Sequence, residues 1–416
     1  MARGGGVEMA DNYDVAIVGG GMVGAMLGCA LGDSPWRVVV LEGRDPQPFE
    51  PAQPCDLRVS ALSRASQQML DAVGAWQRLV AMRVAPYRRM LVWDGEAGGE
   101  TLFDSAEIAE PTLGHIAENR LIQLALRERL LEFDNIDYRC PARCASLRVG
   151  ADVVHLGLDD GAELTAKLVV GADGAGSRVR ELSGIGHSER RYDHDAMVAT
   201  VRTELPQQDI TWQRFVPSGP QALLPLPGHC ASLVWYHRAD QIERLLALDE
   251  DAFLAEFEAR FPERLGALCG LIGRGSFPLI RRHAERYVQP RVALVGDAAH
   301  TIHPLAGQGV NLGLLDAAVL AEILLTADRR RFDPGQLRGL RRYERWRRGH
   351  NHATQSAMDL FYHLFSPQPP PLRVMRSVAL NIANRSTLIR HFCMRYAMGA
   401  AGDLPELARG RLPRAM

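Results

Sequence analysis

The stretch 296–313, with the sequence GDAAHTIHPLAGQGVNLG, carries the residue types best suited to hold a flat, polar ligand. Asp297 follows an apolar run, 292–295, that is typical of a buried parallel strand. A carboxylate at the carboxyl end of such a strand faces the crevice where open α/β sheets bind ligands. A helix is expected to begin near Asn311. Around the start of this helix, three glycines let the backbone pass close to a ligand: Gly307, Gly309 and Gly313. Taken alone, the stretch fits an ordinary glycine-rich turn equally well.

A second glycine pattern, GGGMVG, lies between an apolar strand at 14–18 and an Ala- and Leu-rich helix at 22–31. Each glycine of this G-x-G-x-x-G spacing has its own role. Gly19 permits the tight turn, Gly21 lets the backbone approach a pyrophosphate, and Gly24 allows helix and strand to pack closely. The start of the helix supplies free N–H groups and a favourable dipole for the anion.

A further strand, 37–41, follows, and Glu42 at its end can accept hydrogen bonds from ribose hydroxyls. The order of strand, glycines, helix, strand and acid is far more specific than the glycines alone. We therefore predict a dinucleotide site here, which includes Met22 and Val23 at the helix start.

A third segment, LVVGADGAGSRVR at 168–180, is another strand that leads into a glycine turn and a basic helix start. Taken alone, Asp173 and Gly174 could form an ordinary turn. With the three segments in this order, the chain resembles the class A flavoprotein monooxygenases, which are built like para-hydroxybenzoate hydroxylase. The resemblance implies FAD as cofactor, with its ADP part on the first motif and its ribityl and pyrophosphate region on the last. It associates the middle motif with FAD and the nicotinamide cofactor.

Two further stretches, DLRVSALS at 56–63 and GHIAEN at 114–119, make the chain similar to the ubiquinone-biosynthesis hydroxylases over about residues 12–400. These enzymes add oxygen to a polyprenylated aromatic ring. Three stretches favour members that act on 2-polyprenyl-3-methyl-6-methoxy-1,4-benzoquinol: 87–89, 223–236 and 358–373. Two others, 113–116 and 342–345, are closer to members that hydroxylate C5 of a 2-polyprenylphenol, so both ring positions stay open.

The resemblance also assigns roles to individual residues. It implies FAD contacts at Arg58 and Asn119, and it implies that Asp297 holds the ribityl chain. Backbone N–H groups are expected to face the flavin ring at four positions: Gly309, Val310, Asn311 and Leu312. Pro304 is the residue expected to shape the catalytic face of the ring. His303 is either a polar group near the ring or a structural residue.

The implied reaction uses NAD(P)H and O₂ and passes through a C4a-hydroperoxyflavin. The cofactor carries the difficult step, and the protein positions the ring and excludes water. Only one G-x-G-x-x-G occurs, so we expect NAD(P)H to bind transiently rather than in a second nucleotide fold.

The pattern of elements predicts an α/β chain, α+β overall, with a Rossmann-like FAD-binding domain, a discontinuous antiparallel-sheet substrate domain and a helical carboxy-terminal region. The expected boundaries are a flexible extension at 1–11, an FAD-binding domain at 12–80, 111–187 and 282–330, a substrate domain at 81–110 and 188–281, and the helical region at 331–416. Strands are expected at 90–94, 100–104, 196–203, 210–216, 221–225 and 230–236, and one helix at 251–260.

Composition excludes several function classes. A net charge of −1 in 416 residues argues against nucleic-acid binding. Lys167 is the single lysine, which excludes Schiff-base chemistry and a Walker-type lysine. The seven scattered cysteines indicate reduced thiols, and we expect no metal site, whether at the cysteines or at His300 and His303. No signal peptide or run of ~18 apolar residues is seen, so a cytoplasmic protein is expected, at most peripheral to the inner membrane face.

The carboxy-terminal region leaves alternatives open. The basic run 329–348, which includes aromatics, fits a solvated helix face better than nucleic-acid binding. The apolar and basic mixture at 359–398 fits internal packing and contact between subunits of a homo-oligomer. It also fits contact with a membrane surface or with a partner in a ubiquinone-biosynthesis complex that delivers a prenyl tail. Besides a hydroxylase, the sequence fits a flavin-binding scaffold subunit or a prenyl-chain reductase. A flavin halogenase is disfavoured, because the Trp-x-Trp signature of that class is absent.

Overall fold

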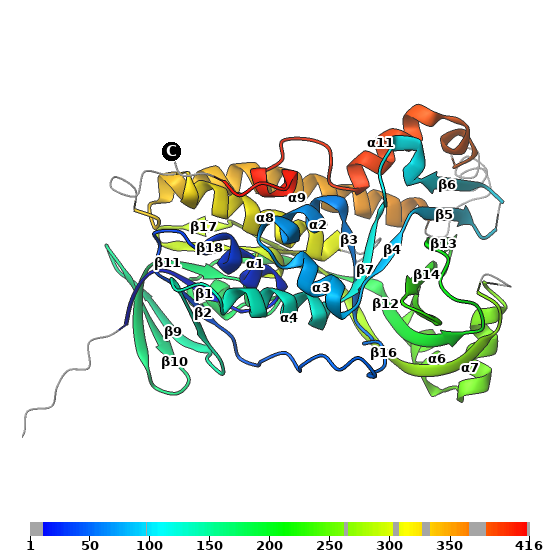
Figure 1. Cartoon of the computed structure of the whole chain (residues 1–416), viewed down its shortest axis with the longest axis horizontal. Coiled ribbons are helices and arrows are strands. Elements are labelled where there is room, and N and C mark those ends of the chain that lie inside the picture. Colours follow the sequence, from blue (N-terminus) through cyan, green and yellow to red (C-terminus); the bar gives the residue numbers. More distant parts are fainter. Residues whose placement is uncertain are drawn as a thin grey trace, which may run out of the picture.

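The computed structural model describes residues 11–96, 98–261, 265–302, 308–326, 333–365 and 380–413. Two large sheets lie toward opposite ends of the long axis of the molecule, and a third, small sheet lies between them (Figure 1).

The first large sheet is built around five parallel strands in the order β18 (Val292–Leu294), β11 (Glu163–Gly171), β1 (Asp11–Val18), β2 (Val38–Leu41) and β8 (Ile136–Arg139). Three antiparallel strands extend it: β17 (Val288–Gln289), β10 (Val154–Leu158) and β9 (Cys144–Val149). The apolar run of β1 is buried from Tyr13 to Val18, as expected for a parallel strand covered on both faces. This confirms the predicted α/β class with a Rossmann-like sheet. β1 begins at Asp11, the last residue of the predicted flexible extension.

Three helices pack side by side next to this sheet: α1 (Met22–Ala30), α4 (Asn119–Leu130) and α8 (Gln308–Leu325). Gly28 of α1 lies so close to α4 that a Cβ there would be 2.6 Å from Leu130. The helix expected near Asn311 in fact begins at Gln308. A short helix, α5 (Arg178–Leu182), follows β11.

The second large sheet has the order β19 (His300–Thr301), β16 (Leu268–Ala284), β12 (His187–Thr203), β15 (Cys230–His237), β14 (Gly219–Leu226), β13 (Ile210–Val216), β5 (Arg89–Asp94) and β6 (Glu100–Asp104). All its pairs are antiparallel except β13 with β5, which run parallel. The expected strands between 90 and 236 all lie in this sheet. The predicted domain boundaries themselves stay a prediction.

One face of the second sheet carries a separate hydrophobic core. Trp212, Leu233 and Trp235 pack there against α6 (Ala239–Ala247) and α7 (Glu250–Glu258). The prediction of a single helix in this region was therefore incomplete, because α6 is short and lies next to the end of β15. The opposite face of the sheet is turned toward the first sheet.

The small sheet consists of β3 (Val59–Ser63), β7 (Gly114–Glu118) and β4 (Ala85–Tyr87), and α2 (Arg64–Ala72) and α3 (Trp76–Met82) follow β3. The sequence analysis did not predict this sheet, because its three strands come from separate segments that meet only in the folded chain. It places Arg58 and Asn119 at neighbouring strand ends, since Val59 pairs with Glu118.

The helical carboxy-terminal region contains α9 (Leu337–Phe365) and α11 (Thr387–Ala397). α9 runs along much of the molecule (Figure 1). Near its start it contacts the first sheet, where the hydroxyl of Tyr343 donates to the carbonyl of Leu294 at 2.7 Å. Farther along, Asp359 binds Arg281 and the hydroxyl of Tyr192 on the second sheet. The aromatics of the basic run 329–348 thus serve packing rather than an exposed surface: Tyr343 is buried, and Trp346 donates to the carbonyl of Asp403.

A fully buried carboxylate, that of Asp316 in α8, joins these elements. It accepts hydrogen bonds from the backbone N–H of Gly296 at 3.1 Å, from Arg347 Nε at 2.7 Å, from Asn351 Nδ2 at 3.0 Å and from the ring of His300. Burial by itself raises the pKa of Asp316, but the charges of His300 and Arg347 outweigh burial and hold it below its usual value. Asp316 therefore stays ionised and ties α9 and the turn at Gly296 to α8.

Replacing Asp316 by Ala leaves Arg347 buried without its counter-charge. We expect the free energy of unfolding at neutral pH to fall by about 3–5 kcal/mol, measured by urea denaturation. Because the pKa of Asp316 is lower in the folded state, its contribution is present above the unfolded-state pKa of about 4. It is lost as the pH falls toward the folded-state pKa, so the difference between wild type and variant should shrink in acid.

The matched control is Asp240→Ala, which removes an exposed ion pair with Arg238 and should leave the midpoint unchanged. A loss for Asp316→Ala no greater than that of the control would contradict the role given to this carboxylate.

Candidate functional site

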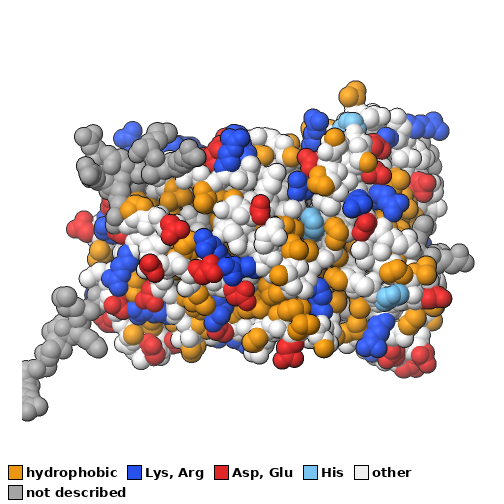
Figure 2. Space-filling model, viewed as in Figure 1, with side chains coloured by type: hydrophobic (Ala, Val, Ile, Leu, Met, Phe, Trp, Pro, Cys, Tyr) orange, Lys and Arg blue, Asp and Glu red, His pale blue; other side chains and the backbone are white. Residues whose placement is uncertain are grey.

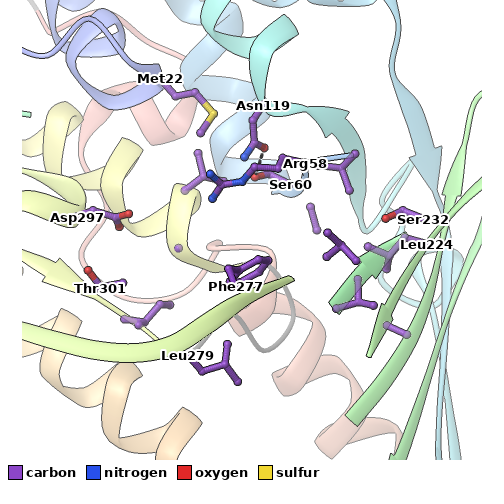
Figure 3. A pocket seen from close by; sticks show the side chains of 18 of the residues that line it. Met22, Arg58, Ser60, Asn119, Leu224, Ser232, Phe277, Leu279, Asp297 and Thr301 are labelled. Carbon is purple, nitrogen blue, oxygen red and sulfur yellow. Dashed lines mark hydrogen bonds between the residues drawn. The ribbon is translucent and has the colours of Figure 1, made fainter. Parts of the chain in front are cut away.

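A cavity of about 530 Å³ lies between the first sheet and the inner face of the second. At one end it is lined by the glycine turns that follow β1 and β11 and by the turn after β18. At the other end it is lined by side chains of β12–β16 and by Tyr87 and Met90. Figure 3 shows the two ends, with Met22 and Asp297 on one side and Leu224 and Ser232 on the other.

The three motif glycines occupy distinct environments. Gly19 has φ +103°, and a Cβ there would lie 2.4 Å from the carbonyl oxygen of Ala172. A Cβ on Gly24 would lie 1.8 Å from the carbonyl oxygen of Gly19, so this position holds the helix against the strand. A Cβ on Gly21 would meet nothing within 4 Å. Gly19 and Gly24 are therefore required by the fold, whereas Gly21 borders open space.

That open space lies in front of the start of α1. Gly21 is the N-cap, no side chain caps the helix, and its first turn has no acidic residue. Free N–H groups and the helix dipole thus face the cavity, which suits a pyrophosphate. Met22 and Val23 line the cavity at the same place. Glu42 follows β2 as predicted and lies against Gly20, although it is not part of the cavity wall, and it accepts from the N–H of Arg44 at 3.0 Å.

Asp297 lies in the short turn Gly296–Ala298 that follows β18. Its side chain is exposed to the cavity but surrounded by protein on its other sides. Desolvation raises the pKa of Asp297, while His300, Arg58 and Arg282 oppose that rise. Gly296 adopts φ +58° and is bonded to Asp316, so the buried network fixes the direction of the neighbouring carboxyl.

Arg58 and Asn119 meet above the middle of the cavity (Figure 3). The N–H of Asn119 donates to the carbonyl of Arg58 at 3.0 Å. The hydroxyl of Ser60 donates to Asn119 Oδ1 at 2.7 Å. The Arg58 guanidinium lies 5.9 Å from the centre of the Phe277 ring, within the range of a cation–π contact. Two residues that are 61 positions apart in the chain therefore form one polar edge, and the sequence analysis named both.

Some predicted residues have structural contacts instead. The Asp173 carboxylate accepts from the N–H groups of Arg178 at 2.7 Å and Val179 at 3.1 Å, so it caps α5, while Gly174 with φ +80° lines the cavity. Asn311 Oδ1 accepts from the N–H of Ser63 at 2.9 Å, and its Nδ2 donates to the carbonyl of Ala61, which joins α8 to β3.

Of the four residues expected to face the flavin ring, Gly309 and Val310 line the cavity, whereas Leu312 is buried behind it. Three predicted residues lie outside the described part of the chain: His303, Pro304 and Gly307. His300, for which a metal was considered, is buried against Asp316. Among the described residues, no three His, Cys, Asp or Glu side chains lie together as a metal site would require.

The sequence analysis did not name the residues that form the apolar end. Val234, Phe277 and Leu279 line it together with Leu224, and Ser60 and Thr301 lie closer to the nucleotide end. Strand alternation could have shown that every second residue of β14 and β15 shares a face, but not which face is turned toward the cavity.

The residues present fit FAD, the cofactor that the sequence resemblance implies. The uncapped start of α1 suits the pyrophosphate, and the open face of Gly21 leaves room for it. Asp297 presents an acceptor for ribityl hydroxyls to the cavity. The edge formed by Arg58 and Asn119 lines the same cavity as the apolar side chains of Leu224 and Val234.

Comparison with known proteins also indicates FAD as the cofactor. Residues 12–356 match the family model described as "FAD binding domain". The chain is 43% identical over 386 residues to 3-demethoxyubiquinol 3-hydroxylase of Escherichia coli, with 93% of this chain and 98% of the relative covered. It is 41% identical to ubiquinone hydroxylase UbiL of Rhodospirillum rubrum, covering 95% and 92%. The mitochondrial ubiquinone biosynthesis monooxygenase COQ6 of Homo sapiens is 34% identical, covering 92% of each chain.

Among solved structures, p-nitrophenol 4-monooxygenase PnpA of Pseudomonas putida superposes with a TM-score of 0.77 at 20% identity, covering 95% of this chain and all of the other. PqsL of P. aeruginosa in complex with 2-aminobenzoylacetate gives 0.73 at 23% identity, covering 91% and 99%. At these identities the match concerns the fold.

The contrast between two motif glycines can be tested directly. Gly21→Ala adds a methyl group where no protein atom lies nearby, so the protein should fold, with the melting temperature of FAD-free wild type, but purify with little FAD. Gly24→Ala forces the backbone of Gly19 to move, so the folded protein itself should be lost or strongly destabilised. Flavin absorbance per protein and thermal melting distinguish the two. Normal FAD content in Gly21→Ala would show that the pyrophosphate does not lie at the start of α1.

Proposed function

The chain belongs to the FAD-dependent hydroxylases of ubiquinone biosynthesis, and on that premise we propose that it hydroxylates the ring of 2-polyprenyl-3-methyl-6-methoxy-1,4-benzoquinol. FAD is its cofactor, and the chain is an FAD-dependent monooxygenase. One observation carries the finer assignment: a single cavity joins the nucleotide-binding turns to an apolar chamber, in a chain that is 43% identical to a 3-demethoxyubiquinol 3-hydroxylase along nearly its whole length.

The overall reaction converts the ring C–H, O₂, NAD(P)H and a proton into the ring C–OH, NAD(P)⁺ and water. Bound FAD supplies the redox chemistry, since it takes electrons from NAD(P)H and activates O₂. The substrate therefore requires no nucleophile from the protein. The work left to the chain is to hold the cofactor, orient the ring and exclude water.

The cavity residues suit these tasks. The start of α1 and Asp297 hold the polar parts of the cofactor at one end. Arg58, whose guanidinium lies 5.9 Å from the centre of the Phe277 ring, supplies a positive charge at the middle of the cavity. Inward-facing side chains of β14–β16, among them Leu224, Val234 and Phe277, form an apolar chamber, which favours an aromatic ring over a polar metabolite.

The experiment is a comparison of substrates on the purified holoenzyme. We expect a short-chain 6-methoxy-3-methyl-benzoquinol to stimulate NAD(P)H oxidation and to gain one oxygen atom, derived from ¹⁸O₂ and not from water. A short-chain 2-alkylphenol should not gain oxygen. Oxygen gain by the phenol alone would assign the C5 reaction instead. Bound FAD with no oxygen gain on either ring would favour the scaffold interpretation.

Asp297→Ala is the matched variant in that assay. A hydroxylase should lose turnover with this change, because the carboxylate holds a polar part of the cofactor at the nucleotide end of the cavity. A flavin-binding scaffold subunit, in contrast, should tolerate Asp297→Ala as long as the variant keeps its melting temperature. Retention of wild-type turnover by a folded Asp297→Ala protein would remove Asp297 from the cofactor site.

We further propose that α11 contacts a membrane surface. Its inner face packs through Met394 and Met398 into the cluster that contains Tyr87 of the cavity wall. Its outer face exposes Leu388 at 84% and Phe392 at 68%. Among the described residues, no helix is both long and apolar enough to cross a membrane.

Charge supports a lipid surface as the occupant of this helix. Arg385 and Arg395 are exposed beside the apolar residues, and Figure 2 shows apolar and basic side chains next to one another at this corner of the molecule. Apolar side chains flanked by cations are typical of helices that lie in an anionic membrane interface. A substrate with a prenyl tail resides in that phase, and the apolar end of the cavity lies on the inner side of the same helix.

The double variant Leu388→Ser with Phe392→Ser should bind phosphatidylethanolamine/phosphatidylglycerol vesicles at least about tenfold more weakly than wild type, because each side chain buries apolar area worth about 1.5–3 kcal/mol. Vesicle co-sedimentation measures this. Leu131→Ser, which changes an exposed leucine directly after α4, is the control and should bind normally. If the double variant binds vesicles normally but changes the oligomeric state in size-exclusion chromatography, α11 is a contact between copies or with a partner protein instead.

A further inference from the structure

We propose that the hydroxyl groups of Thr211 and Ser232 bind oxygen substituents of the substrate ring and so fix its orientation in the cavity. The inference rests on the proposed function, since it concerns the ring that the cavity accepts. It adds two specificity-determining residues on the sheet wall, at the end of the cavity away from the nucleotide turns.

The strand register places these residues in one row across the second sheet. Leu224 of β14 pairs with Ser232 of β15. Trp212 pairs with Leu223, so the preceding residue, Thr211, stands beside Leu224 in an antiparallel pair. On its other side Thr211 pairs with Met90 of β5. Directly opposite residues share a face, so the four side chains of this row point the same way.

That direction is toward the cavity. The alternate residues, Trp212, Leu223 and Leu233, lie in the core formed with α6 and α7 on the other face. All four members of the row line the cavity. Figure 3 shows Ser232 and Leu224 on the wall opposite Asp297, with the hydroxyl of Ser232 turned inward.

Both hydroxyls lack a partner. Thr211 is 3% exposed and Ser232 is 1% exposed, and neither side-chain oxygen has a hydrogen bond among the described residues. A buried polar group left unpaired destabilises a protein by about 1–3 kcal/mol. Between them lies only the apolar side chain of Leu224. Two unpaired hydroxyls on either side of an apolar side chain are what a site for an oxygen-bearing aromatic ring requires.

The spacing limits what can bind. Thr211 and Ser232 are two strands apart, or about 10 Å. Two hydrogen bonds of about 2.8 Å each leave a gap of about 4 Å, the scale of the separation between two oxygens on one aromatic ring. Such a ring would lie over Leu224. A ring with oxygens at both positions is held in one orientation, which determines the carbon presented to the cofactor.

The same row supplies a matched control. Thr200 of β12 pairs with Ser232 and is also buried, but its hydroxyl donates to the carbonyl of Asp56 at 3.5 Å, and it is not part of the cavity wall. Thr200→Val therefore removes a hydroxyl from the same strand row without changing the wall.

The test is a binding titration of the oxidised holoenzyme, followed by the flavin absorption spectrum. One probe is a dimethylhydroquinone, and the other is tetramethylbenzene, in which methyl groups replace both hydroxyls. We expect Ser232→Ala and Thr211→Val each to weaken dimethylhydroquinone binding about 3- to 10-fold and to leave tetramethylbenzene binding unchanged. Thr200→Val should alter neither. Because the two hydroxyls have no protein partner, neither cavity variant should lower the melting temperature or FAD content.

Equal weakening for both probes, no weakening for either, or a fall in melting temperature for the cavity variants would overturn the inference. The outcome is separable from the proposed function. If wild type hydroxylates its quinol but the variants keep the wild-type ratio of affinities for the two probes, only the proposed role of the two hydroxyls is wrong. If the variants weaken binding of dimethylhydroquinone alone, as expected, while no ring gains oxygen, only the hydroxylase assignment is wrong.

Discussion

The ionised carboxylate of Asp316 is the interaction on which the arrangement of the site depends. It is fully buried, yet a backbone N–H, an imidazole, a guanidinium and an amide all donate to it. A buried charge is tolerated only when it is paired and hydrogen-bonded. These donors come from α9 and from the segment after β18, so satisfying one carboxylate brings the carboxy-terminal helix, α8 and the Gly296 turn together. Asp297, the next residue in that turn, faces the cavity as a consequence.

The two large sheets contribute different kinds of groups to the lining of the cavity. The first sheet contributes backbone: turns after β1, β11 and β18, where glycines leave room for a large cofactor. The second sheet contributes side chains, which alternate between the core shared with α6 and α7 and the cavity wall. The two tasks can therefore vary separately. The wall side chains lie on other strands than the glycine turns, so a substitution in the wall leaves the turns after β1, β11 and β18 unchanged.

α9 and α11 connect this interior to the surface. α9 is anchored to the first sheet through Tyr343 and to the second through Asp359, so it limits how far the two sheets can move apart. α11 packs through Met394 against the cluster that contains Tyr87 of the cavity wall, and it presents apolar and basic side chains outward. A ring substrate with a long apolar tail requires an apolar route between the membrane and the cavity, because exposing the tail to water is unfavourable.

The sequence by itself determined the nucleotide end of the site. Gly19, Gly21 and Gly24 have steric roles that follow from their spacing, and Arg58, Asn119 and Asp297 were identified through motifs that are continuous in the chain. Such local patterns are readable because the strand, turn and helix that use them are neighbours in sequence. Only the tertiary structure decided the rest. Asp173 and Asn311 cap or join elements because distant N–H groups lie within reach, and Thr211, Leu224 and Ser232 become one row only when three strands pair in register. Side-chain alternation fixes which residues share a face, but the packing of the whole sheet decides which face lines the cavity.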